Sequence, residues 1–198
     1  MRTKKLIEKQ EKQLSEITAR IMPIAESGRY NGMTIREICE EAGISTGMFY
    51  RHFRSKNDVL SIAYILRLKE FLAAADEKMN GMTFPQQLAF LKIQASLLSS
   101  FLGPDGLLIY INNENEKADC SIMRNMIDDK VKECYQRNPV PLPEGKDLQQ
   151  ILDDITILEK GITFEWFTVG DSFDFEAVTI RMVTDMVKSF FPGEEIHV

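Results

Sequence analysis

The sequence predicts an all-α protein made of a three-helix N-terminal domain with a helix-turn-helix and a helical bundle that follows it. Apolar side chains recur at helical spacing along most of the 198 residues, and no apolar–polar alternation is long enough to build a sheet. Glycines and prolines interrupt the helical stretches, most clearly in the run NPVPLPEG. We expect the N-terminal domain at residues 1–55 and the bundle at residues 56–198.

The segment from residue 34 to residue 56 predicts two short helices joined by a tight turn. One stripe of the first helix is apolar and holds Ile35, Ile38, Cys39 and Ala42. Thr34 is expected to cap this helix, with Glu37 completing a capping box. Gly43 is expected to end it in the left-handed conformation, and Ser45 to cap the next helix. This order of elements is typical of a helix-turn-helix.

The second helix has two unlike sides on a wheel of about 100° per residue. The side expected to pack carries Thr46, Phe49, Tyr50 and Phe53. The side expected to face outward carries Gly47, Met48, Arg51 and His52. A glycine lets a helix approach base edges closely, an arginine pairs with guanine, and a histidine can lie near a phosphate. The outward side is therefore predicted to recognise double-stranded DNA.

The same segment, TIREICEEAGISTGMFYRHFRSK, resembles the signature of the TetR-like family of bacterial transcriptional regulators, T-x-x-x-I-x-x-x-A-G-[VI]-S-x-G-x-[FL]-Y-x-[HY]-F-x-[SN]-K. The matching residues are Thr34, Ile38, Ala42, Gly43, Ile44, Ser45, Gly47, Phe49, Tyr50, His52, Phe53, Ser55 and Lys56. The resemblance by motif covers roughly the first third of the chain. It implies a three-helix DNA-binding domain joined to an all-helical regulatory domain that dimerises.

Carried over position by position, the resemblance implies DNA contacts. Base contacts are implied for Thr46, Gly47, Met48 and Arg51, with Arg36 reaching in from the first helix of the motif. Phosphate contacts are implied for Thr34, Ser45, Tyr50, His52 and Lys56. Other roles remain open, because Thr34 and Ser45 cap helices with or without DNA. Tyr50 also suits a core aromatic, and His52 an ordinary surface histidine.

Charge is divided unevenly along the chain. Residues 1 to 60 hold 11 Lys and Arg against 8 Asp and Glu, whereas residues 61 to 198 hold 13 against 22. The charge that DNA requires is thus confined to the N-terminal part, and binding is expected to weaken steeply with salt. The basic tail with Arg2, Lys4, Lys5 and Lys9 is either a DNA-contacting arm or a solvated, disordered tail. The first helix is expected at about residues 8 to 27, bent at Pro23.

Composition argues against several other classes of protein. Two histidines, His52 and His197, and three cysteines, Cys39, Cys120 and Cys134, provide neither a CxxC pair nor zinc spacing. No glycine-rich phosphate loop or nucleophile elbow is present. No apolar run reaches about 18 residues, and no signal peptide begins the chain. We therefore expect no enzyme activity, metal, cofactor or membrane span, and a cytoplasmic location.

Five helices are expected in the bundle, at about residues 57–80, 84–102, 119–137, 147–168 and 173–191, with a short apolar piece at 107–111. The last two are apolar on more than one narrow stripe. Each needs a core on one side and a partner on another, which favours a homodimer through about residues 147–191. A two-fold dimer requires a near-palindromic operator.

The resemblance also implies a ligand cavity in the regulatory domain. The candidate lining is aromatic, methionine-rich and otherwise apolar: Tyr64, Leu68, Phe90, Tyr110, Met123, Met126, Cys134, Phe164, Trp166 and Phe167. Such residues equally suit an ordinary core. The sequence thus predicts a repressor released from its operator by a small, mainly apolar effector. The alternative is a helix-turn-helix DNA-binding protein with an architectural or constitutive role and no small-molecule effector.

Overall fold

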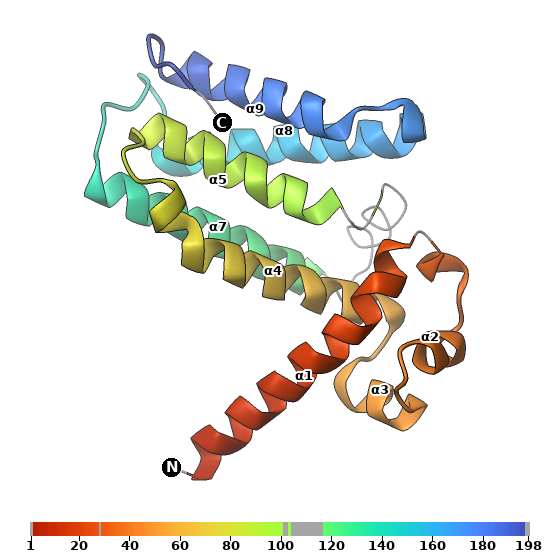
Figure 1. The fold of residues 1–198 in the computed structure, drawn as a ribbon. Helices are drawn as coiled ribbons and strands as arrows, with labels where there is room; N and C mark the ends of the chain where they lie inside the picture. Colours follow the sequence, from red (N-terminus) through yellow and green to blue (C-terminus); the bar gives the residue numbers. More distant parts are fainter. Residues whose placement is uncertain (1, 28, 101–102, 104–116, 197–198) are drawn as a thin grey trace.

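The computed structural model describes residues 2–27, 29–100, 103 and 117–196, and the regular structure in these residues is helical throughout (Figure 1). The N-terminal domain holds α1 (Arg2–Glu26), a short 3-10 turn (Tyr30–Gly32), α2 (Ile35–Glu41) and α3 (Thr46–His52). The bundle holds α4 (Lys56–Lys78), α5 (Phe84–Ser99), α7 (Lys117–Arg137), α8 (Leu148–Val169) and α9 (Phe175–Phe190). The predicted all-α fold, with a helix-turn-helix domain and a helical bundle, is confirmed.

The N-terminal domain has its own apolar core. Ile17, Ile21 and Ile24 lie at i, i+4 and i+7 of α1, and all three are buried. Phe49 of α3 and Phe53, the residue that caps the end of α3, pack into the same cluster with ring centroids 5.2 Å apart. Burial of each such side chain contributes about 1.5–3 kcal/mol relative to exposure. The start of α4 joins this core as well, so the N-terminal domain is fixed to the first turns of the long helix.

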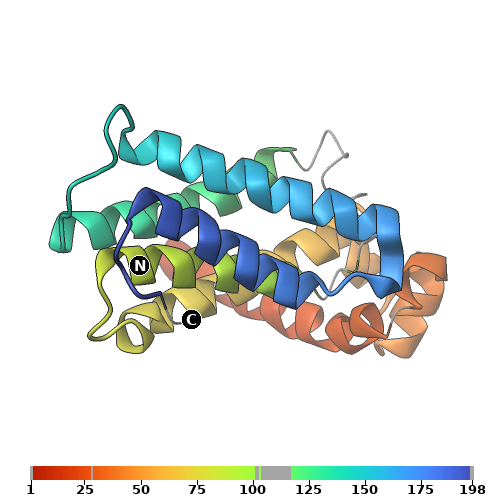
Figure 2. The ribbon, with the colours of Figure 1, turned by 90° about the horizontal axis from the view of Figure 1, so that it is seen from above.

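The bundle has a second, larger core. Residues of all five bundle helices meet in it, among them Leu68, Leu88, Val131, Ile155 and Val183, each almost fully buried. Seen from above, α8 and α9 lie alongside each other over the rest of the bundle (Figure 2). α9 also packs on α5, and α5 packs on α4 and α7. The pair α8 and α9 therefore forms an outer layer with one face left open.

Local sequence signals explain where the bundle helices begin. Gln86 Oε1 accepts a hydrogen bond from the Thr83 amide, and Pro85 occupies the first turn of α5, where its missing N–H costs nothing. Asp147 caps α8 through its side chain, with Gln150 completing a capping box. The expected cap of α5 at Thr83 is confirmed.

Some expected boundaries are wrong. α1 begins at Arg2, not near residue 8, so the backbone of the basic tail is helical and continuous with α1. Pro23 lies in the last turns of this helix. α5 ends at Ser99, before the expected Leu102. The apolar piece expected at 107–111 lies outside the described residues.

Two further findings concern the described part of the chain. None of its helices is both long and apolar enough to cross a membrane. Within the same residues, His, Cys, Asp and Glu side chains form no group of three that suits a metal ion.

Candidate nucleic-acid interface

The turn between α2 and α3 is built from local hydrogen bonds. The Glu37 amide donates to Thr34 Oγ1 at 3.3 Å, and the Thr34 amide donates to Glu37 Oε2 at 2.7 Å. The pKa of the Glu37 carboxyl lies below its usual range, mainly because of the hydrogen bond from the Thr34 backbone and also because of the one from the Thr34 side chain. Gly43 has φ +64°, and the Ile44 amide donates to the carbonyl of Cys39 at 2.9 Å. The predicted capping box and glycine turn are confirmed.

α3 is anchored on one side and exposed on the other. Ser45 caps it by accepting a hydrogen bond from the Met48 amide at 3.1 Å. Phe49 and Phe53 are 0% and 1% exposed, so they fix the helix to the domain core. The opposite side offers Thr46, Gly47 and Arg51 to solvent. A short helix held by two buried rings presents its outer face rigidly.

Two residues of α3 differ from the sides expected of them. Tyr50 was expected on the packing side, but it is 60% exposed, and its ring packs edge-to-face with Phe49 at a centroid distance of 5.5 Å. Met48 was expected outward, but it is half-buried and packs against the domain core. A single-helix wheel cannot place residues at the border of the two sides, because the neighbouring helices decide which of them is covered.

Gly47 has no packing reason to be glycine. A Cβ built at this position would meet only Ser45 Oγ, at 4.0 Å, which is ordinary contact. Its backbone conformation is also helical, so no left-handed turn requires glycine. An alanine would therefore fit within this chain. The missing side chain leaves the backbone of α3 open to whatever approaches its outer face.

His52 and Lys56 depart from the expected outward phosphate contacts. His52 is half-buried, and its Nε2 is buried without a hydrogen-bond partner among the described residues. Lys56 Nζ donates to three backbone carbonyls, those of Tyr30 (3.3 Å), Asn31 (2.9 Å) and Met33 (2.7 Å). Lys56 thus holds the connection between α1 and α2 against the start of α4. In this arrangement its ammonium group has no donor left for a phosphate.

The corner between α3 and α4 is held by contacts that the sequence analysis missed. Tyr30 Oη donates to the Lys56 carbonyl at 2.9 Å, and burial, the main cause, raises the Tyr30 pKa well above its usual value. Asp58 is 6% exposed and accepts from the Arg54 amide (2.8 Å) and from Arg54 Nη2 (2.6 Å). The i,i+4 spacing of Arg54 and Asp58 was the available signal for this pair.

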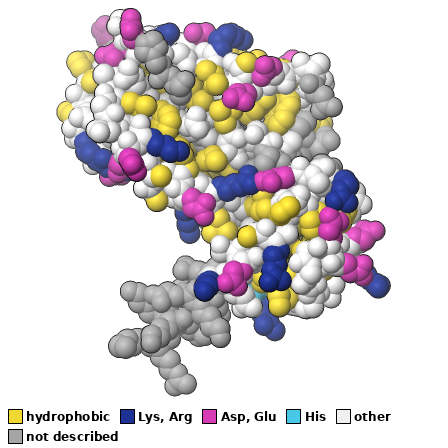
Figure 3. Space-filling model, viewed as in Figure 1, with side chains coloured by type: hydrophobic (Ala, Val, Ile, Leu, Met, Phe, Trp, Pro, Cys, Tyr) yellow, Lys and Arg dark blue, Asp and Glu magenta, His cyan; other side chains and the backbone are white. Residues whose placement is uncertain are grey.

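The outer surface of the N-terminal domain carries both signs of charge, with blue and magenta side chains close together on it (Figure 3). Arg36 is exposed, and its Nε donates to Glu40 at 3.0 Å. Arg29 pairs with Glu41 at 2.8 Å. Arg51 forms no ion pair within the described part of the chain. Of these three arginines, Arg51 alone leaves its guanidinium unpaired, on the outer face of α3.

The predicted ligand-binding residues in the described range have different surroundings. Most of those in the described range belong to the common core of the bundle: Tyr64, Leu68, Phe90, Met123, Met126 and Cys134. Tyr64 Oη donates to the Ala95 carbonyl at 2.8 Å. Phe164 and Phe167 are instead 60% and 37% exposed on α8. Tyr110 lies outside the described residues. Aromatic spacing alone could not separate core, surface and cavity.

Trp166 lies where α8 meets the start of α9. It stacks on Phe175 at the start of α9, with ring centroids 4.4 Å apart. It also packs against the core of the N-terminal domain. The single tryptophan of the sequence therefore connects the α8–α9 layer directly to the helix-turn-helix domain.

A buried polar cluster lies inside the bundle. Lys92 of α5 is 2% exposed, and its Nζ donates to Asp128 Oδ1 of α7 at 3.1 Å and to Thr156 Oγ1 of α8 at 3.2 Å. Glu159 Oε2 lies 3.8 Å from the same nitrogen, and Glu159 Oε1 accepts from Ser96 at 2.8 Å. Burial raises the pKa of the Glu159 carboxyl, against the opposing effect of Lys92. The signal that was missed is a single lysine within the apolar run LAFLKIQ.

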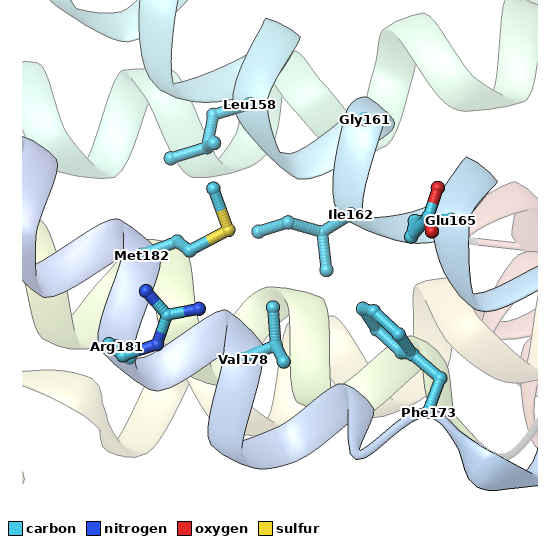
Figure 4. Close-up of a pocket in the computed structure, with 8 residues that line it drawn as sticks. All are labelled: Leu158, Gly161, Ile162, Glu165, Phe173, Val178, Arg181 and Met182. Carbon is cyan, nitrogen blue, oxygen red and sulfur yellow. The ribbon is translucent and has the colours of Figure 1, made fainter. Parts of the chain in front are cut away.

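A groove of about 360 Å³ opens between α8 and α9 (Figure 4). Leu158 and Ile162 of α8 face Val178 and Met182 of α9 across it. Charged side chains stand only at its edges, as Glu165 and Arg181. Ile157, 68% exposed, and Phe164 continue the apolar surface along α8. This open apolar layer falls within the segment expected to dimerise.

The fold and the exposed face of α3 define a helix-turn-helix protein with a helical second domain. Residues 24–61 match the family model described as bacterial regulatory proteins, tetR family. This segment of the chain is therefore a TetR-like helix-turn-helix.

A curated relative and several solved structures are similar over most of the chain. The relative is YerO of Bacillus subtilis (strain 168), an uncharacterized HTH-type transcriptional regulator, 25% identical over 192 residues. The match covers 90% of this chain but 65% of YerO, so this chain spans less than two thirds of that protein's length.

The solved structures share the fold. FadR of Bacillus subtilis, in complex with stearoyl-CoA, is 18% identical with a TM-score of 0.60, covering 87% of this chain and 96% of its own. FadR of Bacillus halodurans is 14% identical with a TM-score of 0.61, covering 92% and 97%. SmeT, the repressor of a Stenotrophomonas maltophilia multidrug efflux pump, is 14% identical with a TM-score of 0.59, covering 93% and 97%. At these identities the likeness shows the fold alone.

Proposed function

We propose that this protein is a sequence-specific DNA-binding transcriptional regulator, a repressor that a small effector releases from a near-palindromic operator. The observation that carries the proposal is the outer face of α3. Two buried phenylalanines anchor this helix, while Thr46, Gly47 and Arg51 face solvent and no packing within the chain accounts for the glycine. A rigid, exposed helix with a close-approach glycine and a free arginine suits the major groove.

The DNA contacts follow from this face. Arg51, Gly47 and Thr46 are proposed to meet base edges, with Arg36 exchanging Glu40 for a base and Met48 contributing its exposed part. Thr34, Ser45 and Tyr50 are proposed to hold phosphates. His52 and Lys56 are proposed to position the motif, because their nitrogens are turned inward. The DNA-binding domain is proposed to comprise residues 1–55.

Residues 56–198 are proposed to form the regulatory and dimerisation domain. The apolar groove between α8 and α9, extended by Ile157 and Phe164, supports a two-fold contact through about residues 147–191. An isolated chain rarely leaves a continuous apolar layer uncovered. The two-fold symmetry then dictates two equivalent half-sites in the operator.

The effector is proposed to be mainly apolar, with the buried cluster around Lys92 as its polar anchor. The complex of Bacillus subtilis FadR with stearoyl-CoA supports a ligand within this fold. Two structural connections could transmit a change in the bundle to the DNA-binding domain. The helix α4 runs from one to the other, and Trp166 of α8 packs against the core of the N-terminal domain. An effector acts only if it binds the DNA-incompetent state more tightly than the competent one.

Salt dependence of DNA binding tests the proposal. The logarithm of the affinity for duplex DNA should fall linearly with the logarithm of salt concentration, and a slope near zero would contradict the proposal.

Tyr50→Phe should weaken binding to every duplex alike, because the phosphates that its hydroxyl is proposed to meet are present in all sequences. Release of bound operator by stearoyl-CoA or another apolar compound would support the repressor proposal. Binding that no such compound weakens would favour a regulator without an effector.

A further inference from the structure

A polar hollow lies where α4 ends and α5 begins, and the proposed DNA and dimer contacts do not use it. Its volume is about 340 Å³, and it is lined by the turn around Gly81, by Gln87 of α5 and by the end of α7. This is the end of the bundle away from α2 and α3 (Figure 1). Its lining is mostly polar, so it does not suit the apolar effector proposed above.

Gln87 gives the hollow an unused acceptor. The side chain is 8% exposed, and its Nε2 donates to the Met82 carbonyl at 3.2 Å. That bond fixes which end of the amide is nitrogen, because the opposite orientation would place two oxygens together. Gln87 Oε1 is buried and has no hydrogen-bond partner among the described residues. A buried acceptor left unpaired lowers stability, and a donor bound in the hollow would remove that penalty.

Two helix ends add negative potential at the same place. α4 ends at Lys78 and α7 ends at Arg137, and residues that follow each helix line the hollow. The C-terminal end of a helix carries about half a negative charge on its last carbonyls. The exposed amides Asn80 and Asn138 stand at the rim. The backbone therefore favours a positive group.

Two charged side chains, Asp76 and Arg137, line the hollow themselves, and their opposite charges balance. Asp76 accepts from Lys130 at 2.9 Å and from Arg137 at 3.0 Å, and Glu133 accepts from the same two cations. The pKa values of the Asp76 and Glu133 carboxyls lie below their usual range, mainly because of the hydrogen bonds from Arg137. Two carboxylates thus face two cations. What remains unmatched among the side chains that line the hollow is the free oxygen of Gln87, which lies beside the two helix ends.

We propose that this hollow binds the cationic N–H group of a small ligand, a guanidinium or primary ammonium group, with Gln87 Oε1 as its buried acceptor. Such a group brings both the charge that the helix ends favour and the donor that Gln87 lacks. The site is distinct from the proposed effector anchor at Lys92. Its test needs neither operator nor effector, so its failure leaves the proposed function standing.

The probes are N-methylguanidinium and N-methylurea, which are close in size and shape but differ in charge. Each is titrated into the full-length isotope-labelled protein at constant ionic strength, and amide resonances of Gly81, Gln87 and Asn138 are followed by NMR. N-methylguanidinium should shift these resonances saturably, with an affinity at least about tenfold above that of N-methylurea. Equal affinities, or shifts that are non-saturable or spread over the whole chain, would overturn the proposal.

Variants separate the site from general surface binding. Gln87→Met keeps the volume but removes the acceptor, and it should weaken N-methylguanidinium binding at least about tenfold. Because Gln87 also supports the turn, a rim variant provides a second test. Asn138→Lys should weaken binding through charge repulsion, whereas Ser189→Lys, at an exposed position on α9 outside the hollow, should not change it. Unchanged affinity in both Gln87→Met and Asn138→Lys would overturn the assignment.

Discussion

Replacing Lys56 with methionine should destabilise the DNA-binding domain, because this ammonium group is the shared partner of three carbonyls. Its Nζ lies 3.3, 2.9 and 2.7 Å from the carbonyl oxygens of Tyr30, Asn31 and Met33, and 5.7 Å from the centre of the Tyr30 ring. A hydrogen bond to a charged group contributes about 1.5–3 kcal/mol. The three bonds share one half-buried cation, so we take the value of one, about 2 kcal/mol. For a chain of this size that corresponds to a fall in Tm of about 4–8 °C.

Thermal unfolding followed by circular dichroism and by Trp166 fluorescence measures this change. The tryptophan is a suitable reporter because it packs on the core of the DNA-binding domain. Arg51→Ala is the matched control, since Arg51 is exposed and should leave Tm unchanged. Lys56→Met should also weaken binding to every duplex alike, because it displaces the connection between α1 and α2. A Tm within about 1 °C of the parent protein, with unchanged DNA affinity, would refute the positioning role of Lys56.

Three further predictions concern specificity, assembly and acid stability. Arg51→Ala should weaken operator binding by about 1–3 kcal/mol and relax specificity at one base pair per half-site. Binding to operator variants with single-base changes measures this effect. Full retention of specificity would contradict the base contact. Phe164→Asp should convert the dimer to a species near the monomer mass of 22.7 kDa in light scattering, whereas Tyr50→Asp, with an equally exposed ring, should remain dimeric. Burial raises the pKa of Asp58, but hydrogen bonds from Arg54 outweigh it and hold that pKa below its usual value. The carboxylate therefore stabilises the fold above its ordinary pKa and loses this effect as pH falls through the folded-state pKa. The free energy of unfolding should thus fall less between pH 5 and pH 3 in Asp58→Asn, and equal losses would contradict the assignment.

The parts of the fold that depend on nearest neighbours in sequence were predictable. Thr34, Ser45 and Gly43 act within three or four residues, and the hydrogen bonds and dihedral angle that they were expected to supply are present. The apolar periodicity of the bundle helices likewise follows from the burial that each helix needs. These features depend on local backbone geometry and on the composition of single helices.

The parts that depend on distant neighbours were not predictable. Lys56 donates to carbonyls 23 to 26 residues away in sequence, so nothing in its own segment indicates that its ammonium group is hydrogen-bonded within the protein. Phe164 and Trp166 lie two residues apart on α8, yet one faces solvent and the other joins the DNA-binding domain. Lys92 is buried because Asp128 and Thr156 come from two other helices. Residue type and spacing do not contain this information.

Selection of bound sequences from a random duplex pool at moderate salt, with the mass of the purified protein determined in the same buffer, tests the central proposal most directly. We expect a protein of twice the monomer mass to recover a near palindrome, and Arg51→Ala to lose one conserved base pair from each half. Recovery of no sequence motif, with weak binding that ignores sequence, would contradict the proposal that α3 reads an operator.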